Sequence, residues 1–189
     1  NIRPTYTFDS LLEKSPIKKS IIQGTDLVFV RELTGGIYFG KRGRNKTDDY
    51  AYDTCEYNVN EIKRLAKIGF ELAMKRSKKL CCIDKANVLE TSRLWRQTVQ
   101  SLEKNYPEVN VSYEFVDAVA MRLIHSPSYY DVLITINLFG DILTDEASVI
   151  SGSMGLMPSA SVGIETSIYE PIHGSFPQAK GKNIAHPLA

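Results

Sequence analysis

Two aspartates, Asp141 and Asp145, carry the clearest chemical signal in the sequence. They lie in NLFGDILTDE (137–146), after the apolar run 131–135, and we expect Gly140 to turn the backbone so that a helix opens at Asp141. The spacing i, i+4 would place both carboxylates on one helix face. Paired carboxylates suit a hard cation such as Mg²⁺ or Mn²⁺, although the pair also fits a helix N-cap followed by a solvated aspartate. The motif therefore predicts a candidate metal site.

Other polar residues stand where predicted strands end, namely Arg31, Lys85, Asp117 and Asn137. The carboxyl ends of parallel strands meet at one edge of a sheet, which is where α/β proteins commonly build their sites. Each residue also has an ordinary interpretation: Arg31 as a salt-bridge partner, Lys85 as a surface lysine, and Asp117 as a helix N-cap. Their convergence favours the functional interpretation.

The elements that must position these residues follow from hydrophobic periodicity. Helical patterns cover 59–77, 90–105 and 118–125, and strand patterns cover 26–30, 80–84, 109–116 and 131–135. The Tyr-rich segment at about 38–57 is predicted to be a protruding hairpin arm, residues 1–20 to be turn-prone, and the small-residue stretch 151–161 to form a hinge or a close backbone contact. The alternation of strands and helices predicts an α/β fold with at least some parallel strands.

Composition narrows the class of protein. The 189 residues are 43% hydrophobic and 24% charged, with a net charge of +1, so we expect no nucleic-acid partner and no membrane partner. The odd set of cysteines includes an adjacent pair in a predicted buried strand, Cys81 and Cys82. This favours a reducing compartment without disulfides, and we predict a cytoplasmic protein.

Motifs along the whole chain then resemble one family. They are NIRP (1–4), VRELTGGIYFG (30–40), DKANVLE (84–90), VDAVAM (116–121), NLFGDILTDE, SGSMGLMPSAS (151–161) and EPIHGS (170–175). In this order they resemble the isocitrate/isopropylmalate dehydrogenase family of β-decarboxylating dehydrogenases, and LTGGIYFG is similar to its isopropylmalate branch. The resemblance implies a mixed sheet flanked by helices with a protruding β arm, and not a classical Rossmann fold.

The resemblance also implies how the chain divides. Residues 1–8 would be the edge of a first, cofactor domain, 9–151 a complete second, dimer-forming domain, and 152–189 a partial return into the first domain. The chain begins at Asn1 rather than at methionine, and we expect it to be a piece of a longer protein. On this interpretation the 189 residues alone would fold and dimerise without turning over substrate.

Binding roles follow from the resemblance. Asp141 and Asp145, together with Asp117, would hold Mg²⁺ or Mn²⁺. Arg3 and Arg31 would bind the substrate carboxylates through charge-assisted hydrogen bonds, and Asp117 would also face the substrate. The family usually has a further arginine where this chain has Glu13, which puts that contact in question.

Catalytic roles follow in the same way. Lys85 would act with Asp117 as the base for the C2 hydroxyl, and Tyr38 would deliver a proton to C3. In the family, Lys85 and Asp117 reach into the site of the partner subunit, so catalysis implies a homodimer. Taken alone, Tyr38 is an ordinary interior or rim tyrosine more often than a catalytic one.

The resemblance places NAD on a Gly- and Ser-rich segment near the end of the chain. The implied contacts are His173, Gly174, Ser175, Phe176, Pro177, Gln178, Gly181 and His186. NAD-using members usually have aspartate where Gln178 stands, and a neutral amide weakens the repulsion that excludes the 2′-phosphate of NADP. His186 stands where asparagine is usual near the adenine.

The implied activity is NAD-dependent oxidative decarboxylation of 3-isopropylmalate to 4-methyl-2-oxopentanoate, with release of CO₂, in leucine biosynthesis. One alternative is a sister enzyme of the same fold that acts on tartrate or D-malate. The other, for the 189 residues alone, is a non-catalytic dimerisation module.

Overall fold

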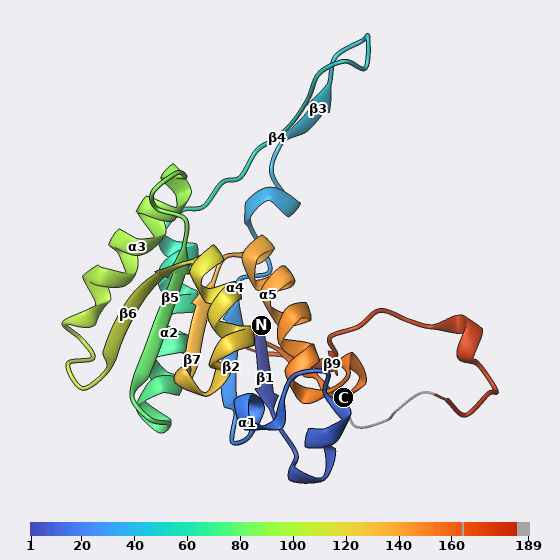
Figure 1. Cartoon of the computed structure of the whole chain (residues 1–189). Coiled ribbons are helices and arrows are strands. Elements are labelled where there is room, and N and C mark those ends of the chain that lie inside the picture. Colours follow the sequence, from blue (N-terminus) through green and yellow to red (C-terminus); the bar gives the residue numbers. More distant parts are fainter. Residues whose placement is uncertain (164, 185–189) are drawn as a thin grey trace.

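A mixed sheet forms the centre of the molecule (Figure 1). The computed structural model describes residues 1–163 and 165–184. The strands of the sheet are β1 (Ile2–Tyr6), β2 (Asp26–Arg31), β5 (Lys79–Asp84), β6 (Asn110–Phe115), β7 (Val132–Thr135), β8 (Pro158–Val162) and β9 (Ser167–Pro171). Their order is β6-β5-β7-β2-β1-β8-β9, in which β6, β5, β7 and β2 are parallel and β1, β8 and β9 join by antiparallel pairing. The predicted α/β fold with a mixed sheet is confirmed.

Helices cover both faces of this sheet. They are α1 (Lys19–Ile22), α2 (Val59–Lys75), α3 (Glu90–Glu103), α4 (Val116–His125) and α5 (Asn137–Ser151), with short 3-10 turns η1 (Asp9–Lys14), η2 (Gly36–Tyr38), η3 (Pro127–Tyr129), η4 (Met154–Leu156) and η5 (Pro177–Ala179). Successive strand residues face opposite sides. Ile134 of β7 therefore packs in the core under α2 and α3, whereas Leu133 packs in the core under α4 and α5. None of the described helices is both long and apolar enough to cross a membrane.

A hairpin arm extends away from the sheet (Figure 1). Its strands β3 (Arg42–Arg44) and β4 (Ala51–Asp53) pair antiparallel and form a separate small sheet. The side chains along the arm are mostly exposed, including Tyr50 and Tyr52. The predicted protruding arm is confirmed.

The start of α2 shows how the sequence fixes an element. The Asn58 side chain accepts hydrogen bonds from the backbone of Asn60 and Glu61, and the Glu61 carboxylate accepts one from the Asn58 backbone, which completes a capping box. Further along the helix, a Cβ on Gly69 would lie 2.3 Å from Cγ2 of Ile134. The missing side chain therefore lets α2 lie close against β7.

Two expectations about local structure were wrong, one at the start of the chain and one at the start of α5. Residues 2–6 form the strand β1, where no strand was expected. Helix α5 begins at Asn137, so Gly140 lies inside the helix and Asp141 is neither its opening residue nor its N-cap. Helix α4 likewise begins at Val116, which excludes Asp117 as its N-cap.

Candidate active site

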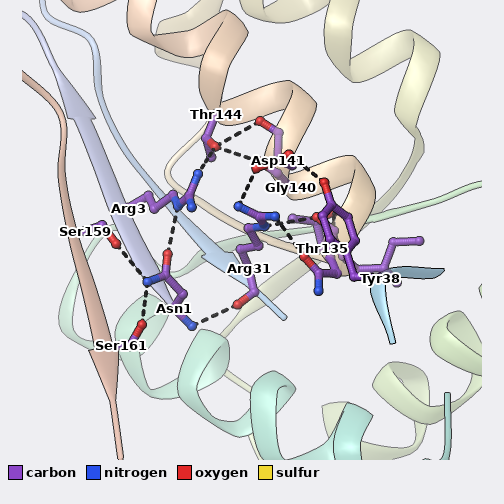
Figure 2. A network of polar contacts seen from close by, with 12 residues as sticks. Asn1, Arg3, Arg31, Tyr38, Thr135, Gly140, Asp141, Thr144, Ser159 and Ser161 are labelled. Atoms are coloured by element: carbon purple, nitrogen blue, oxygen red, sulfur yellow. Dashed lines mark hydrogen bonds and ion pairs between the residues drawn. The ribbon is translucent and has the colours of Figure 1, made fainter. Parts of the chain in front are cut away.

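Arg31 is the centre of a buried polar network at the end of β2 (Figure 2). Only 5% of the residue is exposed. Its Nε donates to the backbone oxygen of Asn137 at 3.0 Å and its Nη2 to Oδ1 of Asn137 at 2.8 Å. Its Nη1 lies 2.6 Å from Oδ1 of Asp141. All three guanidinium nitrogens are thus engaged by the first two turns of α5.

Tyr38 reaches the same aspartate from η2 (Figure 2). Its hydroxyl donates to Oδ2 of Asp141 at 2.6 Å, and its ring centre lies 5.8 Å from the Arg31 guanidinium carbon. The hydrogen bond to Asp141 and partial burial raise the pKa of the Tyr38 hydroxyl. Tyr38 therefore holds its proton at neutral pH, as a proton donor must.

Arg3 enters the network from β1. Its Nη1 donates to Oγ1 of Thr144 at 2.7 Å, and its Nε donates to Oδ1 of Asn1 at 2.8 Å. Burial and the positive charge of Arg31 lower the pKa of Arg3, whereas Asp141 and Asp145 act in the opposite direction. Two buried arginines that repel each other electrostatically form a site suited to a dianion such as a dicarboxylate.

Gly140 allows the helix to approach Arg31 so closely. A Cβ at this position would lie 2.6 Å from Cγ of Arg31 and 2.8 Å from Cγ2 of Thr135. The glycine therefore serves the contact between α5 and β2, not the turn that the sequence suggested.

The loop after β2 is held by a buried carboxylate. Glu32, only 3% exposed, accepts hydrogen bonds from the backbone of Thr34 at 2.8 Å and of Gly35 at 2.8 Å. A Cβ on Gly36, where φ is +76°, would overlap the Tyr57 hydroxyl at 2.2 Å. The loop that carries Tyr38 is thereby fixed from both sides.

Asp141 and Asp145 fit a hard cation. They lie one turn apart on α5, and their carboxylate oxygens are the ligands that Mg²⁺ and Mn²⁺ prefer. Desolvation first, and then the negative charge of Asp141, raise the pKa of Asp145. A bound cation would relieve that repulsion. Among the described residues of one chain, no three His, Cys, Asp or Glu side chains gather into a metal-binding group, so Asp117 does not join the pair within a single subunit.

Lys85 and Asp117 form a second group. Their side chains make an ion pair, and the ammonium of Lys85 lowers the pKa of the Asp117 carboxyl. Lys85 follows β5 and Asp117 lies in the first turn of α4. Within the described part of the chain, no hydrogen bond or ion pair links either residue to Arg31 or Asp141.

The predicted cofactor segment is open to solvent. Residues 173–178 and Gly181 are exposed, and the segment extends away from the sheet (Figure 1). His173 contacts the backbone oxygen of Gly174 at 3.0 Å, and Gln178 lies in η5. His186 lies outside the described residues. The structure therefore does not bring this segment to the arginine–aspartate network.

The structure places Arg3, Arg31, Tyr38, Asp141 and Asp145 near one another, and their roles stay predictions. Asn1, Glu32 and Thr144 also hold the network together but were not predicted, and Asn137 was predicted only as a polar residue at a strand end. The polar ending of a buried strand, Arg31 followed by Glu32, was a signal for Glu32. Thr144 had no such signal, because it lies 141 residues from Arg3. Asn1 had none either, because its side chain also depends on Ser159, 158 residues away.

The chain is similar to known proteins along its whole length. The isocitrate/isopropylmalate dehydrogenase family model matches residues 1–189. The chain is 58% identical over 189 residues to a 3-isopropylmalate dehydrogenase of Bacteroides fragilis and 55% identical over 193 residues to one of Clostridium acetobutylicum. Both alignments cover 100% of this chain but only 53% and 54% of those proteins, so the chain spans about half the length of the curated relatives it matches.

Solved structures share the same architecture. An isocitrate dehydrogenase from Methylococcus capsulatus superposes with a TM-score of 0.89 at 33% identity, covering 100% of this chain and 55% of that one. The TT0538 protein from Thermus thermophilus superposes with a TM-score of 0.88 at 30% identity, covering 100% of this chain and 37% of that one.

Proposed function

Because this chain belongs to the isocitrate/isopropylmalate dehydrogenase family, we propose that it forms the substrate-binding part of an enzyme that oxidises and decarboxylates 3-isopropylmalate. The product would be 4-methyl-2-oxopentanoate, an intermediate of leucine biosynthesis in the cytoplasm. The observation that carries the proposal is the pair of buried arginines, Arg3 and Arg31, beside the carboxylates of Asp141 and Asp145. That arrangement provides cations for a dicarboxylate and oxygen ligands for a metal ion.

The chain's own residues supply binding and proton transfer. Arg3 and Arg31 would bind the substrate carboxylates and fix the C2 hydroxyl near the aspartates. Lys85 would act with Asp117 as the base: the Asp117 carboxylate would take a proton from the Lys85 ammonium, and the neutral amine would then accept the proton of the C2 hydroxyl as C2 is oxidised to a ketone. The bond from C3 to its carboxylate then breaks, CO₂ leaves, and Tyr38 would donate a proton to C3. When bound, NAD⁺ would accept the hydride from C2, and Mg²⁺ or Mn²⁺ would polarise the C2 oxygen.

We propose a homodimer in which Lys85 and Asp117 complete the partner's site. Support comes from their separation, within one chain, from the network around Arg31 and Asp141. The outer faces of α4 and α5 also expose Met121 (68%) and Ile142 (57%), and these helices pack side by side. Large exposed apolar side chains on adjacent helices are typical of a subunit interface. In the dimer, Asp117 would join the partner's Asp141 and Asp145 as a metal ligand.

We further propose that the chain divides as the family implies, at residues 8–9 and 151–152. The strips 1–8 and 152–189 would belong to a cofactor domain, and NAD would bind at residues 173–178, Gly181 and His186. The exposure of residues 173–178 supports this, because a cofactor needs access to the backbone N–H groups of that loop.

The test is a reduction assay on the complete protein with Mg²⁺, offering NAD⁺ or NADP⁺. Isopropylmalate, D-malate, tartrate and isocitrate would be compared in parallel. Preference for isopropylmalate with NAD⁺ is the expected result. Preference for tartrate or D-malate would keep the fold and move the activity to a sister reaction. Preference for NADP⁺ would point to Gln178, whose neutral amide lacks the charge that repels a 2′-phosphate.

Two substitutions separate an enzyme from a dimerisation module. Lys85→Met removes the proposed base, and Asp141→Asn removes a proposed metal ligand. Each should reduce turnover by several orders of magnitude and leave the dimer intact. Activity that survives both substitutions would refute the assigned roles.

A further inference from the structure

We propose that Asn137 is the positioning residue that orients the Arg31 guanidinium for the substrate. This inference rests on the proposed function, since it assumes that Arg31 binds a substrate carboxylate. Asn137 is 2% exposed and is the first residue of α5. It uses both of its acceptors on Arg31, with the backbone oxygen on Nε and the side-chain oxygen on Nη2.

Two acceptors on adjacent guanidinium nitrogens fix the plane of the group. A guanidinium is flat, and hydrogen bonds to Nε and Nη2 together leave no freedom to rotate about the last bonds of the side chain. The remaining nitrogen, Nη1, then points to Asp141, on the same side as Tyr38. Three of the five N–H groups of Arg31 are thereby used, and Asn137 together with Asp141 sets where the second N–H of Nη1 and of Nη2 points toward a ligand.

Asn137 also connects Arg31 to the loop that carries Tyr38. Its Nδ2 donates to the backbone oxygen of Gly35 at 3.2 Å, and its backbone N–H donates to the Tyr57 hydroxyl at 3.0 Å. Gly35 directly precedes η2, where Tyr38 lies. The Asn137 amide therefore connects Arg31, which would bind the substrate carboxylate, to the loop that carries Tyr38, the proposed proton donor.

The ordinary interpretation is that Asn137 only stabilises the start of α5. That role would require a cap on the helix N–H groups, but the Asn137 side chain makes its hydrogen bonds to Arg31 and Gly35 instead. Both polar atoms of the Asn137 side chain therefore bond to residues of the candidate site, the oxygen to Arg31 and the nitrogen to Gly35, and neither caps the helix.

The first test observes Arg31 directly in the 189-residue chain. In the unsubstituted chain, the Arg31 Nη protons should give separate side-chain signals in ¹⁵N–¹H NMR spectra, assigned by their loss in Arg31→Lys. In Asn137→Ala these signals should merge by rotation. In Asn137→Asp, which keeps an acceptor for Nη2 but cannot donate to Gly35, they should stay separate. Arg31 signals that remain separate in Asn137→Ala would overturn the proposal.

The second test measures substrate binding in the complete protein. Asn137→Ala should raise KM for isopropylmalate by about 10- to 100-fold, as expected for lost hydrogen bonds to a charged group. The control is Thr98→Ala in α3, which removes a partly buried hydrogen bond to the backbone oxygen of Leu94 and lowers stability without removing any contact of Arg31. An equal rise in KM in both variants would mean that Asn137 acts through stability alone and would refute the proposal. If the unsubstituted protein oxidises none of the acids, the proposed function fails, whereas the NMR result still decides whether Asn137 orients Arg31.

Discussion

At the scale of single residues, the site depends on close approaches that leave no spare volume. Gly140 lies against Arg31, and Gly36 lies against Tyr57. Interiors are packed densely enough that one added methyl group is felt. These glycines therefore act on the site although neither has a side chain that could contact substrate.

Gly140→Ala should lower the free energy of unfolding by about 1–3 kcal/mol, although alanine is normally the better helix residue. The reason is the 2.6 Å contact that a Cβ would make with Cγ of Arg31. Urea unfolding measures the change. The control is Gly174→Ala, where no atom lies within 4 Å of the added Cβ and the change should stay within about 0.5 kcal/mol. A Gly140→Ala variant as stable as the parent would contradict this account of the glycine.

Cys81 should make the protein less stable in alkali. Burial, assisted by the nearby Glu114 carboxylate, raises the pKa of its thiol from the ordinary 9.0 to about 12. Between those two values the unfolded chain has released a proton that the native protein still holds. The free energy of unfolding should therefore fall by about 1.4 kcal/mol per pH unit from this group. Urea unfolding at pH 8, 9 and 10 should show a shallower decline in Cys81→Ala, and an identical decline would refute the assignment.

At the scale of elements, the turn after a strand is held in place by a buried ion pair, and this fixes the site residue that the turn carries. At the end of β5, the fully buried carboxylate of Asp84 accepts hydrogen bonds from Nε of Arg96 at 2.7 Å and from Nη2 of Arg96 at 3.0 Å. The same carboxylate accepts the backbone N–H of Ala86, and Ser92 accepts that of Lys85. The turn that presents Lys85 is therefore tied to α3.

Arg96→Met should cost about 3–5 kcal/mol of stability, because it leaves the Asp84 charge buried without a partner. Adding Asp84→Asn should recover part of that loss, so the double variant should be more stable than the sum of the single effects predicts. The control is Arg93→Met on the same helix, which removes an exposed pair with Glu90 and a hydrogen bond to the backbone oxygen of Ala86 but leaves no charge buried, so it should cost less, about 1–2 kcal/mol. Additive effects of Asp84→Asn and Arg96→Met would contradict the coupling.

The elements that could be predicted were those with a regular hydrophobic pattern. These are the strands β2, β5 and β7, which are buried on both faces of the sheet, and the helices α2 and α3, which each bury one face. β1 was missed because its residues include Arg3 and Pro4, which local propensity assigns elsewhere. Asn1 exchanges two backbone hydrogen bonds with Arg31. Because hydrogen-bonded pairs alternate along an antiparallel strand, the backbone groups of Ile2 and Pro4 point away from β2. The missing N–H of Pro4 therefore costs no hydrogen bond to β2.

Some residues of the candidate site stand out in the sequence and their supports do not. Arg31, Tyr38 and Asp141 are noticeable by type and by their positions after strands and turns. Asn137 was noticed only as a polar residue at a strand end. Its role depends on contacts with residues 106 and 102 positions away, and no local pattern records such contacts.

At the scale of the whole molecule, α4 and α5 present an apolar outer face that also includes Ile124 and Val149. We expect the chain to sediment as a dimer and the double substitution Met121→Asp with Ile142→Asp to sediment as a monomer, because a buried interface does not tolerate unpaired charges. Sedimentation velocity at matched concentrations measures this. Tyr169→Asp, which alters an equally exposed residue of β9, should leave the dimer intact. A dimer that persists in the double variant would place the interface elsewhere.

The hydrogen bonds of the network also bear on the order in which the chain folds. Arg31 meets Asn137 across 106 residues and Arg3 meets Thr144 across 141, so neither arginine can find its partner before α5 has been synthesised. Closing long loops is slow. We expect pulse-labelling hydrogen exchange to protect α2 and β5 early and β1 last, and early protection of β1 would contradict this order. Until α5 is formed, Arg3 and Arg31 lack Thr144, Asn137 and Asp141 as partners, so two cations that the folded protein buries stay exposed to water.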